Sequence, residues 1–186
     1  PFWVWLGGGG ALAVVAVGGL FALGNQQPSG LPEAGAGLEG LVIFPDPGAG
    51  HAEGEIDYPS DAPIGGTHSP TWQNCGIYSE PVAVEQVIHS LEHGAVWVAY
   101  RPDLPDEQVE ILRDAVRRER SRRGPLIILA PKPDLQDPIV ASAWRVQLRL
   151  ENASDARLPL FLGQYQKGPF TPEPAARCSG GVGNPS

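Results

Sequence analysis

The segment "VEQVIHSLEHGAVWVAY", residues 84–100, changes its hydrophobic period halfway along. Its first half predicts a helix from about residue 81, because apolar side chains recur there at helical spacing, at Val84, Val87, Ile88 and Leu91. Gly94 then favours a helix end, since glycine accepts the left-handed backbone that commonly follows a last turn. The apolar run at residues 95–100 predicts a buried strand. A helix that leads directly into a buried strand indicates a sheet with helices packed against it.

The alternation of strands and helices continues on both sides of this segment. Apolar runs predict further strands at residues 41–44 and 126–130, and an alternating pattern predicts one at residues 139–150. Residues 103–124 predict the longest helix, with Asp103 as its cap, Pro105 in its first turn and Gly124 at its end. A last helix is predicted at residues 154–166. We therefore expect an α+β fold, in which helices pack on one mixed β-sheet.

The first 24 residues differ in composition from the rest of the chain. They contain no charged residue, and as a helix they are long enough to cross the hydrocarbon core of a bilayer. A signal peptide and a buried core helix are the alternatives. We expect a transmembrane helix at residues 1–24, a Gly/Pro-rich linker at 25–40 and one domain at 41–186. Gly18 and Ala22 form a small-xxx-small step, which allows close contact with helices of other membrane subunits.

Charge is distributed unevenly along the chain. Residues 33–100 contain ten Asp and Glu and no Lys or Arg, whereas residues 101–186 contain thirteen basic and eleven acidic residues. The net charge of −8 argues against a nucleic-acid partner, so the arginine-rich run 117–123 is assigned to the solvated end of the long helix. The lack of basic residues after the apolar segment predicts that the domain lies on the extracytoplasmic side of a lipid bilayer.

The chain contains two cysteines, Cys75 and Cys178. In an oxidising compartment an even count favours one disulfide, which would tie the Gly-rich C-terminal segment to the domain. Paired metal thiolates and two free thiols are the alternatives.

Four histidines, all in the acidic half of the chain, are the candidate functional residues. His89 and His93 are four residues apart, so both emerge from one helix face, a spacing that suits one metal ion. His51 and His68 precede them in loops that can fold over that face. The alternative is structural, with His93 stabilising the helix C-terminus and His89 hydrogen bonded to the covering loop.

Several distinctive strings occur together: "YPSDAPIGGTH", "CGIYSEPV", "HSLEHGAVWVAY" and the closing "CSGGVG". In this combination the chain resembles, from Gly50 to Gly183, a bacterial family of membrane-anchored proteins of unknown function whose signature is HSLEHG. The resemblance implies an exported domain anchored in the bacterial cytoplasmic membrane, and it brings no established activity. The chain has "APIGGTH" where the family usually has "PP-SG-H", which argues against chemistry by that serine. The family's recurring polar positions fall on His51, Tyr58, His68, Trp72, Cys75, Tyr78, Glu85, His89, Glu92, His93, Trp144 and Cys178.

Together, the spacing and the resemblance predict one metal ion held by His68, His89, His93 and His51. Glu85 and Glu92 are expected to accept hydrogen bonds from the imidazole N–H groups, or to complete the ligand set. Imidazole ligands outside the cytoplasm suit copper or zinc, and the chain has no Met for an axial thioether ligand.

These residues are compatible with three classes of function. The first is a membrane-anchored, extracytoplasmic metal-binding module. The second, compatible with the first, is a non-catalytic accessory subunit of a larger respiratory or photosynthetic membrane complex. The third is a metal-dependent hydrolase with Glu92 as general base. The sequence contains no nucleophile elbow and no complete zinc-protease motif, so it favours the first two classes and predicts no catalytic residue.

Overall fold

The structure is a computed structural model of the chain, and it describes residues 37–186. The transmembrane helix expected at residues 1–24 lies outside the described residues, as do Gly18, Ala22 and most of the expected linker. Within residues 37–186, no helix combines the length and the apolar character that crossing a bilayer requires.

The described residues form three helices and eight strands. The helices are α1 (Val84–Glu92), α2 (Asp106–Arg123) and α3 (Arg157–Tyr165). The strands are β1 (Val42–Ile43), β2 (Ala49–His51), β3 (Gly66–His68), β4 (Gly76–Ile77), β5 (Val96–Tyr100), β6 (Ile127–Pro131), β7 (Ile139–Ala143) and β8 (Val146–Leu150).

Six of the strands form one mixed sheet in the order β1-β8-β7-β5-β6-β4. The neighbours β5, β6 and β4 run parallel, whereas β1, β8, β7 and β5 pair antiparallel. The strands β2 and β3 form a separate parallel pair. The predicted α+β fold with a mixed sheet is therefore confirmed.

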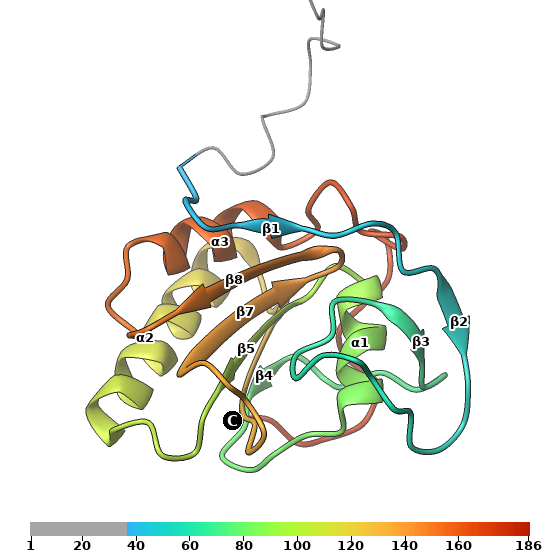
Figure 1. Cartoon of the computed structure of the whole chain (residues 1–186), viewed down its shortest axis with the longest axis horizontal. Coiled ribbons are helices and arrows are strands. Elements are labelled where there is room, and N and C mark those ends of the chain that lie inside the picture. The colour runs from blue at the N-terminus through green and yellow to red at the C-terminus, as the bar shows by residue number, and fades with distance from the viewer. Residues whose placement is uncertain (1–36) are drawn as a thin grey trace, which may run out of the picture. The chain divides into compact units, whose positions relative to one another are not determined.

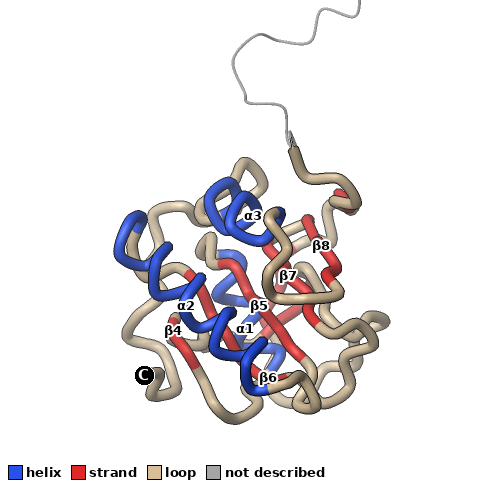
Figure 2. Tube along the Cα trace, turned by 90° about the vertical axis from the view of Figure 1, so that its left-hand side faces the viewer, coloured by secondary structure: helices blue, strands red, loops and turns tan. Residues whose placement is uncertain are grey.

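Helices cover both faces of the sheet, which explains why its strands are apolar almost throughout instead of alternating. On one face α2 and α3 lie side by side, and Phe161 of α3 packs in a core with Leu129 and its neighbours. On the other face α1 buries Leu91 in a second core that contains Trp97. The three layers, with α1 apart from α2 and α3, can be followed in Figures 1 and 2.

Residues 139–150 are a hairpin and not the single strand that their alternation predicts. The chain reverses at Trp144 and Arg145, and Arg145 takes the left-handed backbone with φ of 66°. Such two-residue turns usually contain Asn or Gly, because these residues tolerate positive φ. Since neither occurs here, the alternating pattern runs through the turn without an interruption.

The starts of the helices also differ from expectation. The helix α2 begins at Asp106, after Pro105, and has no side-chain cap, because the carboxylate of Asp103 pairs with Arg101 instead. The helix α1 begins at Val84, three residues later than predicted, and α3 begins at Arg157. The predicted helix ends agree more closely with the structure. Gly94 follows the end of α1 and Gly124 follows the end of α2, and both have positive φ.

Candidate metal site

The candidate site is built on the side of α1 that the β2–β3 pair and its loops cover. The apolar residues Ile88 and Leu91 turn toward the sheet. His89 and Glu92 are three residues apart and therefore emerge as neighbours on another face of the helix. The strand β3 packs directly against α1 and brings a second set of side chains to this face.

The parallel pairing of β2 and β3 places two histidines beside each other. Their register aligns His51 with His68, so the two side chains leave the same face of the two strands. Their rings lie 4.8 Å apart and each lies 5.0 Å from the ring of His89. Residues from three separate elements thus meet at one point.

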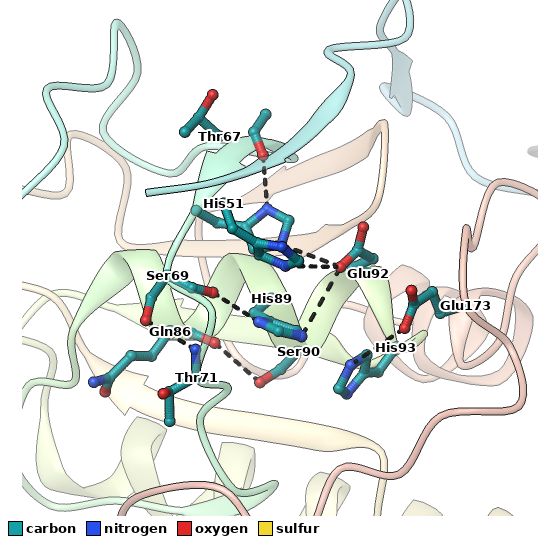
Figure 3. Close-up of polar contacts among 12 residues, drawn as sticks. His51, Thr67, Ser69, Thr71, Gln86, His89, Ser90, Glu92, His93 and Glu173 are labelled. Carbon is teal, nitrogen blue, oxygen red and sulfur yellow. Dashed lines mark hydrogen bonds and ion pairs between the residues drawn. The ribbon is translucent and has the colours of Figure 1, made fainter. Parts of the chain in front are cut away.

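Three imidazole rings converge on one carboxylate oxygen, as Figure 3 shows. The Oε2 atom of Glu92 lies 3.1 Å from Nε2 of His68, 3.9 Å from Nε2 of His51 and 4.0 Å from Nε2 of His89. One ligand atom from each of these four residues lies within 4.8 Å of all the others. With bonds of about 2.0–2.1 Å, tetrahedral zinc ligands are roughly 3.3 Å apart, so each side chain need move less than about 1 Å to bind one ion. The four side chains can therefore hold a metal ion.

Hydrogen bonds from the opposite ring nitrogens hold two of these imidazoles in place. Nδ1 of His68 lies 2.7 Å from the carbonyl oxygen of Gly66, and Nδ1 of His89 lies 2.7 Å from that of Ser69. Each Nδ1 must donate its hydrogen to a carbonyl, which leaves the Nε2 lone pair as the site for a metal. Burial lowers the pKa of His89, and although the bond to Ser69 opposes this, the neighbouring His93 and His68 lower it further. The neutral, ligand form of His89 is thereby favoured.

The contact between His68 and Glu92 requires a proton in the absence of metal. Nε2 of His68 and Oε2 of Glu92 are within hydrogen-bonding distance, and two lone pairs cannot bond to each other. A metal ion bound to both atoms must displace that proton.

Close packing fixes the position of His68, whose side chain is completely buried. The indole of Trp144 meets its ring edge to face, with centroids 6.0 Å apart. Gly65 is necessary for this approach, because a Cβ there would lie 2.6 Å from Pro47 and 3.1 Å from the Trp144 ring, and its φ is +147°. Gly65 of the "IGGTH" string therefore has a packing role beside the site.

His93 lies next to the cluster but is not part of it, which differs from the expected ligand set. Its ring centroid is 4.6 Å from that of His89. However, its Nδ1 lies 2.8 Å from the carbonyl oxygen of Arg177, and its Nε2 lies 3.7 Å from Glu173. Nε2 of His93 thus faces Glu173 and lies outside the group of converging ligand atoms, in which Glu92 is the fourth residue.

The two carboxylates expected to support the site have different surroundings. Glu92 is buried among the imidazoles and is one of the four residues that could hold an ion. Glu85 accepts a hydrogen bond from the backbone N–H of Ile56 at 3.1 Å, and so it fixes the loop after β2. The sequence did contain an indication that Glu92 could join the site, namely the His-x-x-Glu spacing of residues 89–92. Residues three apart lie on the same helix face, just as residues four apart do.

A disulfide joins Cys75 to Cys178, as the even cysteine count predicts. The C-terminal segment is also held by hydrogen bonds, because Val182 and Trp72 pair through backbone groups and Asn74 binds the carbonyl of Gly183. This segment covers the end of α1 that carries His93. The disulfide thus fastens a segment that backbone pairing also positions.

Comparison with known proteins gives a family and no described activity. The model of the family described as "Protein of unknown function (DUF3105)" matches residues 51–180. No curated protein and no solved structure matches the chain. The matched segment runs from His51 to Gly180 and contains all four residues of the cluster. The chain belongs to this family of proteins of unknown function.

Proposed function

We propose that this domain is a binding module for one divalent transition-metal ion, held by His51, His68, His89 and Glu92. The observation that carries the proposal is the convergence of three Nε2 atoms on one buried carboxylate oxygen. Burying a carboxylate among imidazoles is costly unless a proton or a cation compensates its charge. A bound ion supplies that compensation for the whole cluster at once.

The donor set favours zinc or copper. Three imidazole nitrogens and one carboxylate are typical ligands of these ions, whereas calcium and magnesium prefer oxygen ligands only. The disulfide removes both thiols, and the sequence contains no Met, so no sulfur ligand is available. Between the two ions, the tetrahedral arrangement that four closely spaced ligands allow favours zinc.

Binding is favoured over hydrolysis by the number of protein ligands. Catalytic zinc sites commonly have three protein ligands and leave one position for water, whereas structural sites are closed by four. Glu92 is one of the four ligand groups here, so it is not free to act as the general base that a hydrolase would need. The geometry therefore supports a module that holds a metal for storage, delivery or structure.

Metal binding is tested by titrating the purified full chain with zinc or copper against a competing chelator. We expect one ion per chain. The variant His89→Ala should lose most of the affinity, whereas the matched variant His93→Ala should retain it, because Nε2 of His93 faces Glu173 and lies outside the cluster. A wild-type chain that binds no ion, or equal losses in the two variants, would contradict the proposed site.

We further propose that the apolar segment at residues 1–24 anchors the domain to the outer side of the bacterial cytoplasmic membrane. The uncharged composition of the segment and the acidic residues that follow support this location. Protease added to intact spheroplasts should then remove the domain, and complete protection would contradict it. The Gly-rich segment also supports association with other membrane subunits, which predicts co-migration with them in mild detergent.

A further inference from the structure

We propose that His51 is the exchangeable ligand of the site, which an incoming imidazole ligand replaces when the ion is passed to or from a metal-carrying partner. This inference rests on the proposed metal-binding function, and it assigns to the site the transfer of the ion between proteins. Three of the ligands would retain the ion while the fourth is exchanged. The site would then serve delivery, and not only structure.

The four ligand side chains differ strongly in exposure. His51 is 52% exposed, whereas His68 is 0%, His89 8% and Glu92 6% exposed. An ion in the cluster is therefore reached from solvent on the side of His51. An incoming ligand must approach past this ring, because the other three ligand side chains are at most 8% exposed.

His51 is also the ligand that is held least by its surroundings. The rings of His68 and His89 each hydrogen bond to a backbone carbonyl through Nδ1, but within residues 37–186 the His51 ring makes no hydrogen bond. Its Nε2 lies 3.9 Å from Glu92, about as far as that of His89 at 4.0 Å, so the difference between the two rings is the missing hydrogen bond. The ring can turn toward solvent about its own χ angles without breaking the β2–β3 pairing.

The chain around His51 permits this movement. Among the described residues, strand β2 pairs with β3 alone, and residues 45–49 and 53–55 are exposed. Gly48 and Gly54 flank the strand with positive φ, and a Cβ at either would meet nothing within 4 Å. The His51 side chain can therefore turn toward solvent with little loss of packing while the backbone pairing with β3 stays in place.

The incoming group should match the chemistry of the ligand that it replaces. After His51 leaves, two imidazoles and a carboxylate remain, which is a three-ligand set with one open position. A histidine of a metal-carrying protein can fill that position as His51 did. The shared intermediate would hold the ion between both proteins, so the ion need never be free in solution.

The proposal is tested with Co²⁺ and Zn²⁺ on the full chain in mild detergent, using free imidazole as the incoming ligand. His51→Ala should weaken binding by at least about tenfold. Imidazole at roughly millimolar concentration, comparable with the effective concentration of a tethered group, should restore the affinity and the Co²⁺ visible spectrum. His89→Ala should not be rescued, because its site is buried. His68→Ala provides a second buried variant if His89→Ala fails to fold.

The outcomes separate this inference from the proposed function. If the wild-type chain binds no ion, the metal-binding function itself is wrong. If it binds but His51→Ala binds equally well, His51 is not a ligand. If imidazole fails to rescue His51→Ala, or rescues the buried variants to the same extent, His51 is not the exchangeable position.

Discussion

Replacing Glu92 by glutamine removes one ligand charge with almost no change in shape. The amide can still hydrogen bond to Nε2 of His68, which lies 3.1 Å from the carboxylate, so the fold should survive the change. The metal site should not survive it equally well. The three imidazoles lose the anionic oxygen on which they converge, and a neutral amide is a much weaker ligand for zinc.

The size of the effect follows from the number of ligands. Structural zinc sites with four ligands contribute about 10–16 kcal/mol of apparent binding free energy, which is about 3 kcal/mol for each ligand. The loss of one ligand therefore predicts a roughly 100-fold rise in Kd. Zinc at about 100 times the wild-type Kd stabilises the wild-type fold by about 2.7 kcal/mol, but at the same concentration it stabilises Glu92→Gln by only about 0.4 kcal/mol.

Thermal unfolding with and without zinc measures this difference. For a chain of 186 residues the wild-type gain corresponds to a rise in Tm of about 5–11 °C, and the gain of Glu92→Gln to about 1–2 °C. Glu173→Gln is the matched control, because Glu173 also faces a histidine but pairs with His93 outside the cluster. Equal zinc-induced shifts in wild type and Glu92→Gln would refute the assignment of Glu92 as a ligand.

Three further predictions concern the fold around the site. Replacing Cys75 and Cys178 together by alanine should lower the free energy of unfolding by about 2–5 kcal/mol in denaturant titrations, because the disulfide closes a loop between residues 103 apart in sequence; wild type under reducing conditions should fall to the same value. Gly181→Ala should destabilise the chain by about 1–3 kcal/mol, since the new Cβ would lie 2.2 Å from a backbone oxygen, and an unchanged Tm would contradict that packing. Asp61 is buried, which opposes ionisation, but its hydrogen bonds with Arg149 outweigh burial and lower its pKa. Because the pKa is lowered on folding, the stabilisation is present above the unfolded pKa of about 3.9 and is lost as the pH falls below it. In metal-free samples the free energy of unfolding of Asp61→Asn should therefore fall less than that of wild type between pH 6 and pH 3.

Local sequence determined the parts of this protein whose interactions are local. The helix at α1 could be predicted from apolar spacing, its end from Gly94, and the strand β5 from an unbroken apolar run. These features depend on residues a few positions apart, so a short window contains the necessary information. The disulfide could be predicted because only one pairing of two cysteines is possible within a chain.

The hairpin at Trp144 and Arg145 shows where local reasoning fails. An alternating pattern has the same appearance whether a strand continues or reverses, unless the turn contains a residue that favours positive φ. Here the turn is held from outside, because the backbone of Arg145 bonds to Ile64 and Phe44. Those partners are distant in sequence, so the turn depends on the folded domain.

The composition of the candidate site also depends on contacts between residues that are far apart in sequence. The sequence singled out four histidines, but His51 and His68 meet only because β2 and β3 pair in register. Helical spacing placed both Glu92 and His93 near His89 and could not choose between them. The tertiary structure makes that choice, because Nε2 of His93 faces Glu173 of the C-terminal segment, whereas the carboxylate of Glu92 lies among the imidazoles. Residue types are thus present in the sequence, whereas the ligand set arises from backbone pairing between segments that only the tertiary fold brings together.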